Sequence, residues 1–337
     1  MITKPWLFLP SSWLYSLSPL ALKFYSHFKS AQPYQWKSVK WRGLSFPNPL
    51  GTAGGLDKNA LYVQDYWALG AGFVEVGTVT PRAQAPNPYK ILDRSVQHLS
   101  LWNNMGFPNK GLDFVKKQLE LLFEKFNGSQ TDKPKLPSPL FVNIGKNRDT
   151  PVTQALEDYK KGMEALYPFA EAFVINISSP NTKDLRELFS AQKLPAFLKS
   201  LNEIRLGLKV NRPLILKLSP DEEDFTRIIE QSLSAGIDGW CICNSTKQRP
   251  IKNLFPEDKG GLSGKLLADT SLKLLKQLNA YLVKNKIEDK LVISCGGVLT
   301  AQDVLDRLEL GADLAQVYSA VVFKGFGFFE SVYKELS

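Results

Sequence analysis

Eight short runs of β-branched and other apolar residues recur along the chain, and each of them ends in glycine or polar residues. Longer stretches with helical periodicity separate most of these runs, which is the pattern of parallel strands connected by helices. The runs occupy residues 49–53, 72–77, 140–145, 172–177, 213–218, 238–243, 291–295 and 313–318. Eight repeats of this kind predict an α/β fold in which the sheet closes on itself, a (β/α)8 or TIM barrel.

The expected helices cover most of the intervals between the strands. They span residues 59–69, 152–166, 187–206, 221–235, 267–284, 301–310 and 320–336, and residues 127–139 are expected to form a loop. A doubly wound open sheet is the alternative, but it is less favoured because the chain lacks the GxGxxG turn. With 337 residues the chain can hold a barrel of about 250 residues and a small extension.

The extension is expected at the N-terminus, as a helical segment over residues 1–36 that precedes a barrel domain over residues 37–337. No Asp or Glu occurs before Asp57, although the net charge of the whole chain is +9. The basic residues of this stretch are Lys4, Lys23, Lys29, Lys37, Lys40 and Arg42, and four of the seven tryptophans lie beside them, at positions 6, 13, 36 and 41. Aromatic rings interspersed with lysines are typical of a segment at a membrane surface.

Within this segment, Leu20, Phe24 and Phe28 recur at helical spacing. The pattern predicts an amphipathic helix that begins at Ser18 with Pro19 in its first turn, and a second short helix around residues 12–16. No apolar run reaches the roughly 20 residues that a spanning helix needs, so we expect the segment to lie on a bilayer. Two alternatives stay open: the segment packs on the barrel as a cap, or it is a mitochondrial transit peptide.

The three cysteines, Cys241, Cys243 and Cys295, are too few and wrongly spaced for a disulfide framework or a zinc site. We therefore expect them to be packing residues and expect no metal site. The net charge of +9 is also compatible with nucleic-acid binding. Because the charge is concentrated among aromatic residues and no RNA-binding motif is present, no nucleic-acid partner is expected.

In a β/α barrel the chemistry lies at the carboxyl ends of the strands. Three kinds of residue occupy these ends. Glycines 296 and 297, with Ser319 and the glycines of residues 261–264, favour a phosphate group. Lys58 and Lys217 suggest either a Schiff base or positive charge beside an anionic cofactor, with a surface lysine as the alternative. Asparagines 103, 143, 176, 181 and 244 match the alternating donors and acceptors of a flavin or a pyrimidine dione.

The motifs GGLDK, EVGTVTP, NNMGF, NIGKN, NISSPNT, GGLSG, CGG and VYS, in this order, resemble those of dihydroorotate dehydrogenases, specifically the membrane-associated class 2. The resemblance extends over residues 37–336. It implies that the chain oxidises (S)-dihydroorotate to orotate with FMN as cofactor and a membrane quinone as acceptor, in the de novo biosynthesis of UMP. It further implies a monomer on the membrane surface, at the cytoplasmic side of a bacterial inner membrane or at the mitochondrial inner membrane of a eukaryote.

The same resemblance implies roles for individual residues. Ser179 would be the catalytic base that accepts the C5 proton while C6 delivers hydride to the flavin, with Thr78 as a helper. The implied FMN positions are Gly54, Gly55, Leu56, Asp57, Lys58, Thr78, Asn143, Asn176, Lys217, Cys243, Gly264, Gly297, Tyr318 and Ser319. The implied substrate positions are Lys58, Asn103, Asn104, Met105, Gly106, Phe107, Asn176, Asn181, Asn244 and Ser245. Arg94 would contact the quinone, and residues 182–190 would close over the substrate.

Three positions depart from the family pattern: Asn104 stands where an arginine is usual, Cys243 replaces a threonine, and Lys183-Asp184 replaces Pro-Gly. These changes affect the hydrogen bonding of the flavin and the mobility of the closing loop. A flavin-independent barrel lyase with Lys217 as the Schiff-base nucleophile is the competing enzyme hypothesis.

Overall fold

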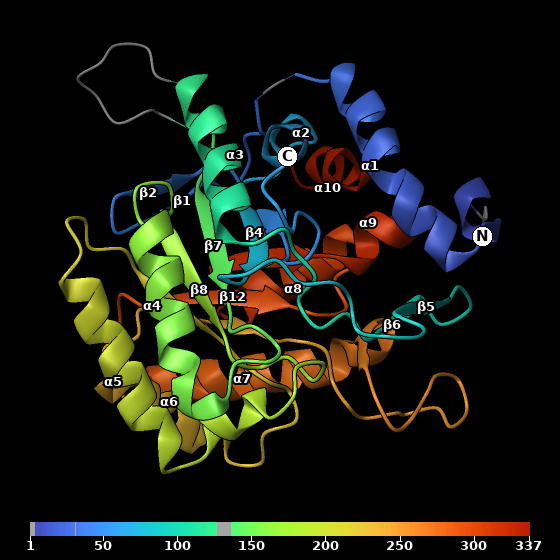
Figure 1. Cartoon of the computed structure of the whole chain (residues 1–337). Helices are drawn as coiled ribbons and strands as arrows, with labels where there is room; N and C mark the ends of the chain where they lie inside the picture. The colour runs from blue at the N-terminus through green and yellow to red at the C-terminus, as the bar shows by residue number, and fades with distance from the viewer. Residues whose placement is uncertain (1–3, 31, 127–135) are drawn as a thin grey trace.

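The computed structural model describes residues 4–30, 32–126 and 136–337, which include a parallel eight-stranded sheet (Figure 1). Its strands, in spatial order, are β3 (Leu50–Thr52), β13 (Leu314–Val317), β12 (Leu291–Cys295), β10 (Gly239–Ile242), β9 (Leu214–Lys217), β8 (Ala172–Asn176), β7 (Leu140–Ile144) and β4 (Val74–Val79). The two outer strands meet, because Gly51 pairs with Phe73 and the Thr52 N–H donates to the Phe73 carbonyl at 3.2 Å. The predicted barrel is therefore confirmed.

Helices surround the barrel, and the strands are buried on both faces, as expected for a sheet covered by helices. The helices of the barrel are α2 (Val63–Ala68), α3 (Leu112–Glu124), α4 (Ala155–Leu166), α5 (Lys193–Leu206), α6 (Phe225–Ser234), α7 (Ala268–Lys284), α8 (Ala301–Glu309), α9 (Ser319–Lys324) and α10 (Phe328–Leu336). Short 3-10 turns precede three of them: η2 (Val152–Gln154), η3 (Leu185–Phe189) and η4 (Lys265–Leu267). Most of the expected loop, residues 127–135, lies outside the described residues.

Several helix boundaries differ from the predictions for local reasons. The helix expected over 320–336 is two helices, because Gly325 adopts a φ of +85° between α9 and α10. Helix α6 begins later than expected, since the Asp224 carboxylate caps it by accepting the Arg227 N–H at 3.0 Å. Helix α2 is short because the Asp57 carboxylate accepts the Tyr62 N–H at 2.7 Å. Helix α3 has no counterpart among the expected helices.

Two small antiparallel sheets close the ends of the barrel, and neither was predicted. At the amino end, β1 (Val39–Trp41) and β2 (Leu44–Phe46) form a hairpin whose Phe46 ring lies 5.9 Å from Phe73 and 6.0 Å from Phe141. At the carboxyl end, β5 (Leu92–Ser95), β6 (Ser100–Asn103) and β11 (Gly261–Gly264) form a three-stranded sheet beside the N-terminal segment (Figure 1). This second sheet carries Asn103 and Gly264 to the mouth of the barrel.

The N-terminal segment consists of the 3-10 turn η1 (Pro5–Phe8) and a single helix α1 (Ser11–His27). The prediction that a helix begins at Ser18 is wrong, because α1 continues through Pro19. A proline has no N–H to donate to the carbonyl four residues earlier. Here the Ser18 hydroxyl donates to that carbonyl, on Tyr15, at 3.1 Å, which compensates for the missing hydrogen bond.

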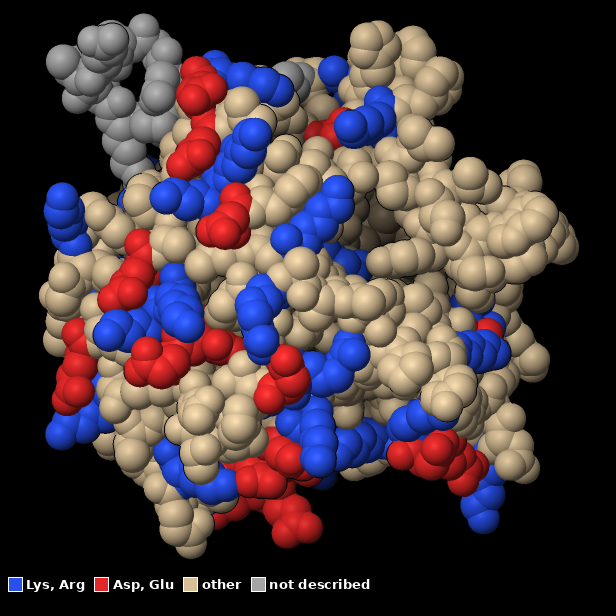
Figure 2. All heavy atoms as spheres, in the orientation of Figure 1, with Lys and Arg blue, Asp and Glu red and all other residues tan. Residues whose placement is uncertain are grey.

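One face of α1 packs on the barrel and the other faces outward. Leu22 is buried, and the Ser26 hydroxyl donates to the Asp65 carboxylate at 2.5 Å. The row of Leu20, Phe24 and Phe28 is exposed, at 70%, 71% and 70% respectively. Figure 2 shows this part of the molecule, at the right, as a largely uncharged surface. Among the described residues, no helix combines the length and the apolar character needed to cross a membrane.

Candidate active site

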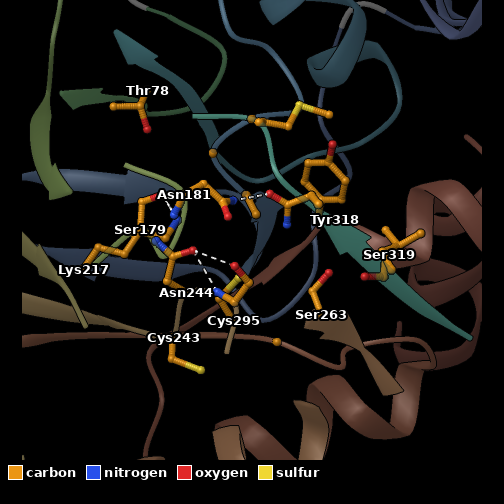
Figure 3. Close-up of a pocket in the computed structure, with 18 of the residues that line it drawn as sticks. Thr78, Ser179, Asn181, Lys217, Cys243, Asn244, Ser263, Cys295, Tyr318 and Ser319 are labelled. Atoms are coloured by element: carbon orange, nitrogen blue, oxygen red, sulfur yellow. Dashed lines mark hydrogen bonds between the residues drawn. The ribbon is translucent and has the colours of Figure 1, made fainter. Parts of the chain in front are cut away.

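The main cavity opens at the carboxyl ends of the barrel strands and, with its mouth, holds about 1080 Å³ of empty space. Most of the residues predicted for flavin, substrate and catalysis line it, and Figure 3 shows several of them. They are Gly54, Gly55, Lys58, Thr78, Asn103, Met105, Gly106, Phe107, Asn176, Ser179, Asn181, Lys217, Cys243, Asn244, Ser245, Gly264, Gly297, Tyr318 and Ser319. Gly54 and Ser319, which are 265 positions apart in the sequence, thus meet in one cavity.

Four predicted residues are not in the wall of this cavity. The Asp57 carboxylate is occupied by backbone N–H groups of the loop before α2. The side-chain oxygen of Asn104 accepts from the Asn87 side chain at 2.9 Å, so Asn104 holds a neighbouring loop in place. Leu56 lines a second cavity. Asn143 lies one layer below the main cavity, where it supports the residues that line the wall.

A buried polar network forms the floor of the cavity around Glu75, a residue that was not predicted. One Glu75 carboxylate oxygen accepts from Asn143 at 2.6 Å and lies 3.2 Å from the Lys217 ammonium, and the other accepts from Gln316 at 2.6 Å. All four side chains come from barrel strands. The signal for Glu75 and Gln316 was present in the sequence, since each is a polar residue inside an otherwise apolar strand run.

This network determines the charge of Lys217. Burial, the largest single influence, lowers the pKa of the Lys217 ammonium. The attraction to Glu75, its hydrogen bond and the nearby Cys241 and Cys295 thiols together outweigh burial, so the pKa lies above its ordinary value. A Schiff-base nucleophile must be a neutral amine. The pairing with Glu75 therefore argues against the lyase hypothesis and favours a fixed positive charge at the cavity floor.

The next layer is a set of mutually bonded amide and hydroxyl groups centred on Asn176. Its side-chain nitrogen donates to the Thr78 hydroxyl at 2.9 Å and its oxygen accepts from Asn244 at 3.2 Å. Asn244 also donates to the Ser178 hydroxyl at 3.0 Å. Because each group holds the next, the orientation of these side chains is set before any ligand binds.

Ser179 stands in the wall between this layer and a pair of asparagines (Figure 3). Its hydroxyl oxygen accepts the Asn181 backbone N–H at 3.2 Å, and the Asn181 side chain donates to the side-chain oxygen of Asn103 at 2.7 Å. The side-chain oxygen of Asn181 is buried and has no hydrogen-bond donor among the residues that the structure describes. A buried acceptor without a donor is unfavourable, so this oxygen is suited to a ligand N–H.

The loop over residues 182–190 lies next to this wall without lining the main cavity, and it is anchored by Arg186 of η3. The Arg186 guanidinium donates to the Ser178 carbonyl at 3.0 Å, to the Ser245 carbonyl at 3.2 Å and to the Asp221 carboxylate at 2.6 Å. Asp221 also accepts the Lys247 N–H at 2.8 Å. One ion pair thereby joins the loop to the segments that carry Ser179 and Ser245.

Glycines and buried thiols line the far end of the cavity. Gly264 and Gly297 adopt φ angles of +87° and +76°, and a Cβ atom at Gly297 would lie 2.5 Å from the Cβ of Ala268. The Cys243 and Cys295 thiols are free and buried in this wall, and burial raises the pKa of Cys243. Cys295 and Ser263 were not among the predicted site residues. Among the described residues no His, Cys, Asp and Glu cluster is arranged to hold a metal.

A second cavity of about 1700 Å³ lies between α1 and the barrel and is lined mostly by apolar side chains. Leu14, Tyr15 and Leu22 of α1 form one side and Phe326 lies on the other. Arg94 lines it, and its guanidinium donates to the Leu7 carbonyl at 3.0 Å and to the Leu9 carbonyl. Arg94 thus also tethers the N-terminal segment.

The two cavities share a wall that includes Lys58 and Tyr318. The Lys58 ammonium donates to the Gly55 carbonyl at 2.7 Å and lies 5.1 Å from the centre of the Tyr15 ring of α1. Lys58 therefore contacts the N-terminal segment as well as the barrel, which no pattern in the sequence predicted.

Comparison with known proteins identifies relatives over most of the chain. The model of the family described as dihydroorotate dehydrogenase matches residues 37–337. A dihydroorotate dehydrogenase (quinone) of Thermus thermophilus is 40% identical over 84% of this chain and 77% of its own length. One of Deinococcus radiodurans is 41% identical over 84% and 74%. The crystal structure of an Eimeria tenella DHODH in complex with ferulenol superposes with a TM-score of 0.82 at 31% identity, covering 99% of this chain and 92% of that one.

Proposed function

Because this chain belongs to the dihydroorotate dehydrogenase family, we propose that its main cavity binds FMN and dihydroorotate side by side. The chain oxidises dihydroorotate to orotate with a quinone as electron acceptor, a reaction of pyrimidine biosynthesis. Enzymes of this family are generally flavin-dependent. The identification of the flavin as FMN, and every residue role below, are our proposals.

The residues of the cavity fit FMN in both charge and shape. At the glycine-lined end, Gly264 and Gly297 adopt positive φ angles, and the Gly297 N–H has no backbone acceptor among the described residues, which suits a phosphate group. The carboxamide of Asn176 suits the donors and acceptors of the flavin ring, and the charged Lys217 suits a ring that becomes anionic on reduction. When bound, FMN supplies the acceptor for a hydride. The residues proposed to hold it are Gly54, Gly55, Lys58, Thr78, Asn176, Lys217, Cys243, Gly264, Gly297, Tyr318 and Ser319, with Asn143 supporting them from below.

The observation that carries the substrate assignment is the convergence of Ser179 with Asn103, Asn181 and Asn244 on one wall. The free side-chain oxygen of Asn181 would accept a ring N–H of dihydroorotate, and Lys58 would bind its carboxylate. Met105, Gly106, Phe107, Asn176 and Ser245 would complete the substrate wall.

Ser179 is proposed to remove the C5 proton of the substrate. Its oxygen already accepts the Asn181 N–H, which fixes the direction of the hydroxyl group. A neutral serine is a weak base, so its own proton must pass to a water molecule or a neighbouring hydroxyl as the C5 proton arrives. Thr78 stays a proposed helper because it lines the same cavity as Ser179. Its hydroxyl accepts from Asn176, and no hydrogen bond joins it to Ser179 among the described residues.

The apolar cavity under α1 is proposed to admit the quinone, with Arg94 in its wall. The exposed row of Leu20, Phe24 and Phe28 would enter the acyl region of a bilayer, while Leu22 and Ser26 keep α1 on the barrel. We further propose a monomer held peripherally on the membrane, at the cytoplasmic face of the inner membrane in a bacterium or at the mitochondrial inner membrane in a eukaryote.

Anaerobic reduction of the purified protein tests cofactor and substrate together. The protein should show a flavin absorption spectrum that dihydroorotate bleaches within seconds and that a quinone restores. The released flavin should be FMN by chromatography. A colourless protein, or a flavin spectrum that dihydroorotate leaves unchanged, would contradict this assignment of the main cavity.

A further inference from the structure

Arg307 of α8 is a fully buried cation directly behind the glycine-lined end of the main cavity. Its side chain has an exposed fraction of 0%. Its guanidinium donates to the Gly296 carbonyl at 2.6 Å and to the Asp303 carbonyl at 2.9 Å, and its Nε has no partner among the described residues. The mechanism described above does not use this side chain.

No carboxylate neutralises this charge at close range. Within the described part of the chain, no Asp or Glu oxygen forms an ion pair with Arg307. The Asp303 carboxylate lies one turn away on the same helix, but it accepts the N–H groups of Leu299 and Thr300, both at 2.9 Å, and caps α8. Burial lowers the pKa of Arg307, yet a guanidinium stays charged at neutral pH.

A buried charge is unfavourable unless an opposite charge or strong hydrogen bonds compensate it. The hydrogen bond from Arg307 to the Gly296 carbonyl points toward the main cavity, since Gly296 and Gly297 are both part of its wall. The same wall is where backbone geometry favours an anion. The position of Arg307 is therefore suited to a negative group that binds in the cavity.

The route from Arg307 to the cavity is a single peptide unit. The Gly296 carbonyl, which accepts from Arg307, and the Gly297 N–H belong to the same peptide group. A hydrogen bond from a cation to the carbonyl polarises the peptide and makes its N–H a stronger donor. In the described residues no acceptor is present for the Gly297 N–H, so this donor is available to a ligand.

We propose that Arg307 is a positioning residue for the phosphate group of the flavin and makes the cavity select FMN over riboflavin. It polarises the Gly296–Gly297 peptide and adds positive potential behind it. This inference rests on the proposed binding of FMN, and it predicts that the contribution of Arg307 depends on the phosphate group rather than on the ring.

Binding of FMN and riboflavin to flavin-free protein tests the inference by quenching of flavin fluorescence. Arg307→Gln keeps a donor for the Gly296 carbonyl but removes the charge, and Arg307→Lys keeps the charge. We expect Arg307→Gln to lower FMN affinity about tenfold and riboflavin affinity less than about twofold. Arg307→Lys should retain most of the preference for FMN.

Two other results would overturn the inference. Equal losses of FMN and riboflavin affinity in Arg307→Gln would assign Arg307 to packing alone, and an unchanged preference for FMN would remove it from phosphate recognition. Melting temperatures of the flavin-free variants separate a folding defect from a binding defect, and Arg307→Lys provides the comparison if Arg307→Gln is unstable. If the wild-type protein binds FMN no more tightly than riboflavin, the FMN assignment itself fails.

Discussion

The main cavity and the apolar cavity share Lys58 and Tyr318, but they are built in different ways. The polar side chains of the main cavity come from barrel strands and the loops after them, and they hydrogen-bond to one another below and around the cavity. One side of the apolar cavity is the N-terminal segment, which contacts the barrel through a few side chains such as Trp6, Ser26 and Lys29. The main cavity therefore depends on the positions of individual polar groups. The apolar cavity depends on the position of the whole helix α1.

From this difference we expect that replacing one polar side chain in the main cavity strongly lowers activity or stability. Replacing side chains in the segment over the apolar cavity should have a weaker effect on binding. A preorganised polar site loses its function when one group is removed, because the neighbouring groups lose their partner. An apolar surface made of several similar side chains loses affinity gradually. Four substitutions test this contrast.

The largest effect is expected from Ser179→Ala. Loss of a general base commonly lowers a rate by a factor of about 10² to 10⁴, so flavin reduction by dihydroorotate should slow about 10³-fold. Stopped-flow absorbance measures it, and reoxidation by quinone should be unchanged. Ser263→Ala, which removes another hydroxyl from the same cavity, is the matched control and should change the rate less than about threefold. A near-normal rate in Ser179→Ala would exclude Ser179 as the base.

Glu75→Gln should destabilise the protein by about 3 kcal/mol, because it leaves the buried Lys217 ammonium without its counter-charge. Chemical denaturation measures the free energy of unfolding. The raised pKa of Lys217 means that the ion pair stabilises the fold below the ordinary lysine pKa and that this contribution is lost as the pH rises through the raised value. The difference between wild type and variant should therefore stay constant between pH 6 and pH 9.

The control for this substitution is an exposed ion pair. Asp149→Asn breaks the contact between Arg82 and Asp149, whose side chains are 64% and 70% exposed, and should cost less than about 1 kcal/mol. If Glu75→Gln cost no more than Asp149→Asn, the Glu75 network would not be what holds Lys217 at the cavity floor.

Asp221→Asn should weaken the anchor of the loop over Ser179 and lower kcat/KM for dihydroorotate about 30-fold. The Arg186 guanidinium would lose its charged partner and position the Ser178 and Ser245 carbonyls less firmly. Because only the substrate side is affected, the rate of quinone reduction by the reduced enzyme should stay the same. Glu187→Gln, which breaks an exposed pair with Lys193 in the same loop, is the control. Equal losses in both half-reactions would contradict a local role of the loop.

The smallest effect is expected at the exposed face of α1. Leu20→Ser combined with Phe28→Ser should lower binding to phospholipid vesicles about tenfold, since Phe8, Trp13 and Phe24 remain exposed nearby. Flavin reduction by dihydroorotate and turnover with a short soluble quinone should be unchanged. Leu206→Ser combined with Val283→Ser removes two exposed apolar side chains elsewhere and serves as the control. Equal vesicle binding by both double variants would contradict the proposed membrane face.

The barrel could be predicted from the sequence because its signal is local. Every strand run is short, apolar and bounded by polar residues, and all eight strands overlap the predicted ranges. The carboxyl ends of parallel strands meet at one side of a barrel, so the polar residues that follow the strands had to converge there. For the same reason the predicted asparagines 103, 176, 181 and 244 all line one cavity.

The tertiary structure decided what no local pattern contains. The charge of Lys217 depends on Glu75, 142 residues away. The docking of the N-terminal segment depends on groups such as Val322, at the other end of the chain. The place of Arg307 behind Gly296, and of Asn143 below the cavity rather than in its wall, likewise became visible only in three dimensions. Periodicity determines which face of an element is buried, whereas the partner that a buried polar group meets depends on how distant elements pack, and that partner determines its charge and its role.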